Sequence, residues 1–569
     1  MNCPMQKFGY LIFLITFLFS GLILSAQKRK DTTVVVRDDY KVKIANPQKY
    51  LEVPEISDTV REKLNIRYDL NSRKVPTAYE IDPIKAANIK NESISQLQRG
   101  FLKAGYGSYL TPYGEIYYNQ GRSKKFGAGA HFKHLSSSGQ IAKRGYAGFS
   151  NNDMDLNGKY FLKKATLSGN IDYKHHLLHY YGFDPAKESL PEYQKTDLTK
   201  NGTRQFYQLF RLNSTIGDNY PVDSQATKFN AEMDYYHFSD RAKATENAFL
   251  IRGNSSFYYK TYAFSASGYL NYFGNTNQSD TGSMTILNLF PGITFNKNLW
   301  RLKAGLNTYI SSDEDNSFRV VPELDFNFHI YKDIIILNAG TDSRLKRNSW
   351  RMMIQENPFL RSDVAASNTW APMRLYSGLR GALGSRMAFN LRASYGKIDN
   401  QYFFVNDTTS GNFNKMNVVF DNVSLTEING ELSWQQNKKI EIIAKANYLG
   451  YKMDKEQKPW HVPALRLSLS GKYNIQDKIT VTPVILYLSN QFSKEISTST
   501  DTSTGKKSFS VQSNRINGIT DVNIAIDYKY TQRLGMFLYL NNILNVRYER
   551  FRDYPTQRFN LLAGVFYSF

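Results

Sequence analysis

Apolar and polar side chains alternate along many short segments of this chain. From Leu465 to Asn474 and from Glu323 to Ile330, every second residue is apolar or glycine and the residues between are polar. A period of two is typical of a β-strand with one apolar face and one wet face. The pattern recurs, with occasional breaks, at Phe229–Tyr235, Thr426–Trp434, Ile440–Tyr448 and Val522–Tyr530. We find no convincing helical period beyond Phe101, so we predict an all-β fold.

The last strand of the chain shows the alternation most clearly. Its odd-numbered positions are all apolar, namely Phe559, Leu561, Ala563, Val565, Tyr567 and Phe569. Asn560, Gly564 and Ser568 lie between them, although Leu562 and Phe566 make this second face less polar. One face therefore suits lipid and the other a wetter interior, as in a membrane strand.

The connections between predicted strands alternate in length when counted back from Phe569. Short turns are predicted at 530–535, 474–478, 435–439, 383–386, 331–333 and 296–298. Long loops are predicted at 491–515, 452–461, 399–422, 346–372, 311–317 and 182–204. Short turns at one end and long loops at the other define the polarity of outer-membrane barrels. We predict a transmembrane antiparallel β-barrel of about 22 strands over residues 101–569, with both termini periplasmic.

The first 26 residues have the pattern of a secretory signal peptide. Lys7 precedes an almost wholly apolar run from Phe8 to Leu24, and Leu24-Ser25-Ala26 precedes the polar Gln27. An uncleaved anchor helix is the alternative, but it needs about 20 apolar residues. Cys3 is the only cysteine, so cleavage after Ala26 leaves none for disulfide or metal chemistry.

Residues 27–100 differ from the rest of the chain in having few paired apolar positions. Pro47, Pro54, Pro76 and Pro83 are spread among polar stretches. Such a composition is typical of extended chain rather than a packed domain. We predict a mostly extended N-terminal segment in the periplasm or entering the barrel lumen.

The formal net charge of +22 adds a question about partners. For a secreted chain it indicates lipopolysaccharide phosphates or an anionic solute rather than nucleic acid. A solvated basic surface without a specific ligand is the alternative.

The closing hairpin resembles a known family. It reads Leu540-Asn541-Asn542-Ile543-Leu544-Asn545, then Tyr548, Tyr554-Pro555, Arg558, Gly564 and Tyr567-Ser568-Phe569. This series is similar to the last two strands of TonB-dependent outer-membrane receptors, and the lysine-, asparagine- and tyrosine-rich composition resembles a Bacteroidota protein. The resemblance implies a transport barrel without cofactor, in contact with outer-membrane lipid. It also implies a plug inside the barrel, yet 27–100 holds about half the residues that such a domain needs.

Two further segments carry expectations from this resemblance. Val565, Tyr567 and Phe569 resemble the terminal signal that the barrel-assembly machinery reads. The run Asp31-Thr32-Thr33-Val34-Val35-Val36 is similar to the box through which these receptors add a strand to TonB or another periplasmic partner. A Thr/Val run that arises by chance is the alternative interpretation.

Arginines are the main candidates for ligand binding. Strand parity sends Arg374, Arg380 and Arg392 into the lumen, and the preceding strand adds Arg344. The loop 346–372 adds Arg351 and an unusually apolar set, Trp350, Met352, Met353, Phe359, Leu360 and Trp370. Guanidinium groups favour carboxylate or phosphate ligands. The alternatives are that the arginines neutralise lumenal carboxylates such as Glu427 and Glu431, and that the loop folds inward, packs on a partner or packs on itself.

No nucleophile–base pair, paired carboxylates or metal-ligand spacing stands out, so we predict neither an enzyme nor a metal site. Two functions stay open. One is a barrel that binds or passes an extracellular solute, and the other is a scaffold whose lumen is filled by the N-terminal segment or by a partner.

Overall fold

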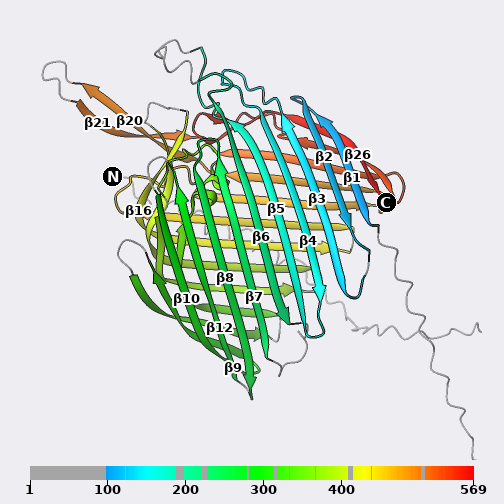
Figure 1. Ribbon diagram of the computed structural model, residues 1–569, viewed down its shortest axis with the longest axis vertical. Coiled ribbons are helices and arrows are strands. Elements are labelled where there is room, and N and C mark those ends of the chain that lie inside the picture. Colours follow the sequence, from blue (N-terminus) through cyan, green and yellow to red (C-terminus); the bar gives the residue numbers. More distant parts are fainter. Residues whose placement is uncertain are drawn as a thin grey trace, which may run out of the picture. The chain divides into compact units, whose positions relative to one another are not determined.

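The computed structural model describes residues 98–121, 123–186, 198–218, 227–260, 262–277, 281–312, 317–331, 334–365, 367–407, 414–437, 439–500 and 507–569 (Figure 1). The predicted signal peptide, the segment 27–97 and the TonB-box-like run lie outside these residues.

Antiparallel strands close into a single 22-stranded barrel, which confirms the predicted fold class. Each strand pairs with its neighbours along the sequence, β19 pairs with β22, and β26 pairs with β1 to complete the ring. The strands are β1 Gly100–Gly107, β2 Thr111–Asn119, β3 Phe126–Ser137, β4 Phe149–Phe161, β5 Ala165–His179, β6 Arg204–Asp218, β7 Lys228–Asp240, β8 Thr245–Tyr259, β9 Tyr262–Thr276, β10 Thr281–Asn296, β11 Trp300–Ser311, β12 Ser317–Tyr331, β13 Ile335–Asn348, β14 Ser367–Leu383, β15 Met387–Asn406, β16 Met416–Gln436, β17 Ile440–Met453, β18 Leu465–Ile475, β19 Ile479–Leu488, β22 Ile519–Lys529, β23 Leu534–Asn541 and β26 Asn560–Ser568.

Three smaller elements lie in the long connections. β20 (Gln491–Thr500) and β21 (Lys507–Ile516) form a separate hairpin that projects beyond the barrel (Figure 1). β24 (Glu549–Phe551) pairs with β25 (Tyr554–Pro555) between β23 and β26. The helix α3 (Trp350–Glu356) lies between β13 and β14.

The strand faces follow the predicted alternation. In β26, Leu561, Val565 and Tyr567 are exposed on the outer face, and Gly564 on the other face is paired with Gly105. In β18, Leu467, Leu469 and Tyr473 are likewise exposed on the outer face. Exposed apolar residues of the neighbouring strands continue this face around the ring. A continuous outward apolar surface is what a bilayer requires. No described helix is long and apolar enough to span a membrane.

The bounds of the flanking strands match the six predicted short connections, but three long connections differ from the prediction. The segment 399–422 is mostly strand, because β15 continues to Asn406 and β16 begins at Met416. The segment 491–515 is mostly the β20–β21 hairpin. In 346–372, α3 replaces a stretch for which we predicted no helix. Ser349 caps this helix, since its side chain accepts a hydrogen bond from the Met352 N–H.

Candidate functional site

The hairpin made by β13 and β14 leaves the barrel wall at its long-loop end. Pairing between β12 and β13 stops at Leu324 and Thr341, whereas β13 and β14 stay paired up to Asn348 and Ser367. Register shifts interrupt β13–β14 between Asp342 and Arg344, β14–β15 between Trp370 and Arg374, and β15–β16 between Ile398 and Gln401. Irregularities of this kind bend a strand, so this part of the hairpin is free to turn inward. We call residues 342–373 the inner hairpin.

The stem of the inner hairpin packs on the lumenal face of the barrel. Leu345 is buried in a cluster with Met284, Ile286 and Tyr309, which lie on β10 and β11. The Trp370 ring meets the Tyr309 ring edge-on, with centroids 5.4 Å apart. These wall positions alternate with exposed outer residues such as Ile310, so the contacts are made inside the barrel.

The tip of the inner hairpin crosses the lumen. Trp350, Met353 and Ile354 of α3 and the following Leu360 and Val364 are buried in one cluster. On one side this cluster holds wall residues of β6–β9, and on the other side Phe404 of β15 and Met416 of β16. The two groups of strands are six to ten strands apart in a ring of 22. Inward folding is therefore the alternative that the structure shows for this apolar loop, and it closes the long-loop end of the lumen.

A buried carboxylate anchors the start of α3 to the opposite wall. Glu246 on β8 is 1% exposed and accepts the Trp350 N–H at 2.7 Å and the Tyr236 hydroxyl at 2.7 Å. Two further wall hydroxyls donate to backbone carbonyls of the tip, Tyr207 to Pro358 at 3.0 Å and Tyr180 to Leu360 at 3.1 Å. The tip is thus held by specific hydrogen bonds in addition to apolar packing.

The connection from β23 to β26, residues 542–559, adds a second layer to this closure. Phe551 and Tyr554 join the same buried cluster, and Tyr554 stacks on Phe359 of the inner hairpin at 3.7 Å between centroids. The Tyr554 hydroxyl donates to the Asn414 carbonyl. We call the inner hairpin and residues 542–559 together the cap.

A buried histidine in the 454–464 loop fastens the cap to the wall. His461 Nδ1 lies 2.9 Å from the Phe404 carbonyl oxygen, and the Arg552 N–H donates to Nε2 at 3.3 Å. One ring nitrogen must donate and the other accept, which specifies the neutral ring. Burial lowers the pKa of His461 to about 4, in keeping with this neutral state.

The structure brings two of the predicted arginines together around one carboxylate. Arg374 binds Asp342 in a bidentate pair, with both N–O distances 2.9 Å, and reaches Glu427 at 3.5 Å. Arg392 lies 3.4 Å from Asp342 and over the Tyr376 ring. The positions of these arginines match the alternative in which they neutralise lumenal carboxylates, and their predicted role in ligand binding stays a prediction.

The other predicted residues lie apart from this pair. Arg380 lies further along β14, 3.5 Å from the Asn327 side chain. Arg344 follows the register shift and is exposed, and its predicted role in ligand binding stays a prediction. Trp350 and Arg351 belong to the tip of the cap, where Arg351 lies over the Tyr236 ring, and Trp370 belongs to its stem. No group of residues in the described parts of the chain is arranged to hold a metal ion.

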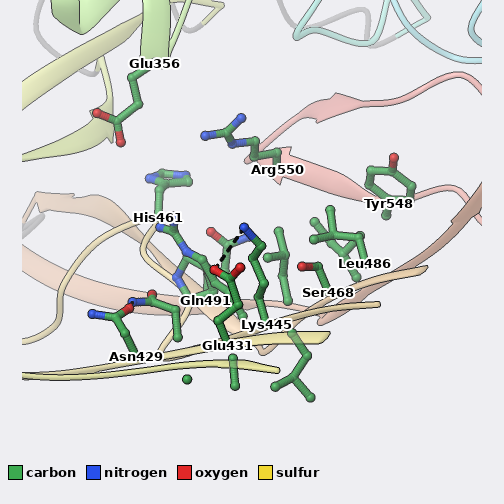
Figure 2. Close-up of a pocket in the computed structure, with 18 of the residues that line it drawn as sticks. Glu356, Asn429, Glu431, Lys445, His461, Ser468, Leu486, Gln491, Tyr548 and Arg550 are labelled. Carbon is green, nitrogen blue, oxygen red and sulfur yellow. Dashed lines mark hydrogen bonds and ion pairs between the residues drawn. The ribbon is translucent and has the colours of Figure 1, made fainter. Parts of the chain in front are cut away.

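A cavity of about 660 Å³ lies between the cap and the lumenal wall of β15–β19 (Figure 2). Glu356, His461, Arg550 and Phe551 line it from the cap and its neighbouring loop. The wall contributes mostly polar and charged residues, namely Asn390, Arg392, Asn429, Glu431, Lys445, Asn447, Arg466 and Ser468. Of these wall residues, only Arg392 and Glu431 were named from the sequence as lumenal candidates. The alternation along each strand also indicates that the other wall residues face the lumen.

Comparison with known proteins gives a match for the structure but none for the sequence. No family model and no curated protein sequence matches this chain. The FrpB iron transporter from Neisseria meningitidis (F5-1 variant) has a TM-score of 0.62 at 9% identity, covering 84% of this chain and 83% of that one. The siderophore receptor PirA from Acinetobacter baumannii has a TM-score of 0.60 at 11% identity, with 84% and 81% covered. The ferric-catecholate import receptor Fiu from E. coli K12 has a TM-score of 0.56 at 11% identity, with 84% and 82% covered. The chain therefore shares the barrel fold of these iron and siderophore receptors.

Proposed function

We propose that this protein is an outer-membrane barrel that binds an extracellular anionic solute and passes it across the membrane, with the cap as its gate. The observation that carries the proposal is the closed lumen, which is blocked by a hairpin of the barrel itself and holds a charged cavity directly behind it. A 22-stranded barrel is wide enough to need such closure. Iron and siderophore receptors of the same fold support a role in transport.

The proposal includes an orientation and a set of partners. A signal peptide of residues 1–26 delivers the chain, the barrel-assembly machinery inserts it through the strand ending at Phe569, and the long loops face outward among lipopolysaccharide. In this proposal the inner hairpin closes the lumen at its long-loop end. The Bacteroidota-type composition agrees with a Gram-negative outer membrane.

A scaffold function is the second candidate, and the same closed lumen favours it. Specific hydrogen bonds hold the tip, which donates to Glu246 and accepts from Tyr207 and Tyr180, as it would in a permanently filled barrel. The projecting β20–β21 hairpin offers such a scaffold a site for a surface partner.

Conductance in planar bilayers separates the two functions. Replacing residues 350–365 with a short Gly-Ser linker removes the tip of the cap, and heat-modifiable gel migration confirms that the variant barrel is folded. We expect the wild type to be closed and the variant to conduct with anion selectivity, read from the reversal potential in a KCl gradient. A variant that is as closed as the wild type, or that selects cations, contradicts the transport proposal.

Coupling to a periplasmic TonB-type protein has its own test. Val35→Pro removes a backbone donor from the Asp31–Val36 run, so it should abolish capture of the full-length protein by a TonB C-terminal domain. Undiminished capture would show that this run is not the binding segment.

A further inference from the structure

One side chain in the cavity has no hydrogen-bond partner although it is fully buried. Gln491, at the start of β20, is 1% exposed and lines the cavity (Figure 2). Neither its amide nitrogen nor its amide oxygen has a hydrogen-bond partner among the described residues. Buried polar groups are nearly always paired, and an unpaired one is unfavourable. This amide is therefore arranged for a polar group that comes from outside the protein.

The backbone around Gln491 is fixed, so its side chain cannot easily turn elsewhere. Gln491 is paired with Ile516 on β21, and the His461 N–H donates to the neighbouring Phe492 carbonyl at 2.8 Å. Because His461 is itself bound to Phe404 and Arg552, the position of Gln491 depends on the loops that form the cap.

The charges that line the cavity favour an anion. Lys445 is paired with Glu431 at 3.2 Å, and Arg392 is paired with Asp342 at 3.4 Å. Within the described part of the chain, Arg466 and Arg550 form no ion pair. Two guanidinium groups are thus left to bind oxygen atoms of a carboxylate or a phosphate.

Amides on the wall add a preference for hydroxyl groups. Asn447 donates to Asn429 at 2.5 Å, and Asn429 donates to Glu427 at 2.9 Å, which leaves further donor and acceptor capacity on this row. Asn390 lines the same side of the cavity, and Leu486, Leu488 and Ile519 supply an apolar boundary. A volume of about 660 Å³ is in the range of small-molecule sites.

We propose that the cavity behind the cap is a binding site for a small hydroxylated anion, whose carboxylate or phosphate lies between Arg466 and Arg550 and whose polar oxygen pairs with Gln491. The inference rests on the proposed function in that it names the class of solute and the place where that solute is held. The proposed binding residues, Arg466, Arg550 and Gln491, are different from Arg374 and Arg392, which pair with Asp342.

Binding to the full-length protein in detergent tests this site without any transport assay. Isothermal titration calorimetry with citrate and with glucose 6-phosphate distinguishes carboxylate from phosphate recognition, and glucose and putrescine serve as neutral and cationic comparisons. We expect saturable binding of at least one anion and none of glucose or putrescine. Absence of saturable binding by both anions, or equal binding of putrescine, overturns the proposal.

Variants identify the residues. Arg466→Gln and Gln491→Leu should each weaken anion binding about tenfold or more. Arg252→Gln, at an arginine of β8 that pairs with Glu232 and does not line the cavity, should bind as the wild type does. Gln491→Leu has a second signature, since replacing an unpaired buried amide with an apolar side chain of similar size should raise the melting temperature of the ligand-free protein. Unchanged affinity in both cavity variants, or a lower melting temperature for Gln491→Leu, contradicts the assignment.

The two proposals fail in different ways. Anion binding together with a pore that stays closed when the tip of the cap is removed sinks the transport function and leaves this site intact. An anion-selective pore together with no anion binding that depends on Gln491 and Arg466 sinks this site and leaves the transport function intact.

Discussion

Removing the Glu246 carboxylate should open the barrel. In Glu246→Ala the Trp350 N–H at the start of α3 and the Tyr236 hydroxyl both lose their acceptor. Both groups lie in a buried environment, where water cannot replace the lost oxygen without the tip moving. The variant keeps the barrel strands unchanged, so its effect should fall on the cap.

The size of the effect follows from the two hydrogen bonds. Each bond to a charged acceptor stabilises by about 1.5–3 kcal/mol, and the neighbours relax in part when both are lost. A net loss of about 3 kcal/mol multiplies the population of the open state by roughly 10². An effect of this size is visible as a change from rare to frequent openings in single-channel recordings.

Glu232→Ala is the matched control, because it removes the same charge from the neighbouring lumenal strand. Glu232 accepts from Asn213 at 3.0 Å and pairs with Arg252 at 3.4 Å, and neither partner belongs to the cap. Hydrogen exchange at the Trp350 amide gives a second measurement, which should accelerate only in Glu246→Ala. If the Glu246 variant opens as rarely as the wild type, or if the Glu232 variant opens as often as the Glu246 variant, then Glu246 does not hold the cap closed.

Three other predictions concern separate parts of the molecule. Lowering the pH from about 6.5 to about 4 should loosen the cap, because the unfolded ring takes up a proton in this range while buried His461, with a pKa of about 4, does not. The loss is at most about 3 kcal/mol. It should appear as a lower protection factor of the Arg552 amide, which is the exchange rate relative to an unprotected amide at the same pH, and a protection factor independent of pH in His461→Asn is the control. Arg374→Lys should lower the melting temperature of the barrel through loss of about 1 kcal/mol, since an ammonium cannot reproduce the bidentate pair with Asp342, and an unchanged melting temperature would contradict this. Phe569→Ala should reduce the folded fraction in the membrane while the inserted barrel keeps its melting temperature, and normal insertion would disprove the signal role of this residue.

The wall of the barrel was predictable because the polarity of each strand residue indicates whether it faces the lipid or the lumen. Leu467 and Leu469 are apolar since they face outward, and no distant contact is needed to read this. The same rule explains the error in 399–422. Phe403 and Phe404 are both buried, in clusters on opposite sides of β15, so the strand has no wet face and loses its alternation.

The cap and its cavity were not predictable to the same degree. Leu345 packs on strands some 35–60 positions away, and the register shift after Asp342 depends on how β13 pairs with β14, which the alternation within one strand does not show. Gln491 gives no signal in the sequence, because its importance comes from the absence of partners in the folded protein. The pairing of Asp342 with Arg374 could have been predicted, because the two residues lie directly opposite each other on β13 and β14 and therefore face the same side.

The seam between β1 and β26 has a consequence for how the barrel is assembled. It joins residues more than 450 positions apart, and the Arg99 and Gly100 N–H groups donate to the Phe569 carbonyl at 2.7 and 2.8 Å. Until these last bonds form, the sheet has two free edges whose backbone groups lack partners, a costly state in hydrocarbon and a template for aggregation. Every intermediate before closure therefore leaves both edges unpaired, and the backbone groups of β1 and β26 gain their partners only when residue 569 meets residue 100.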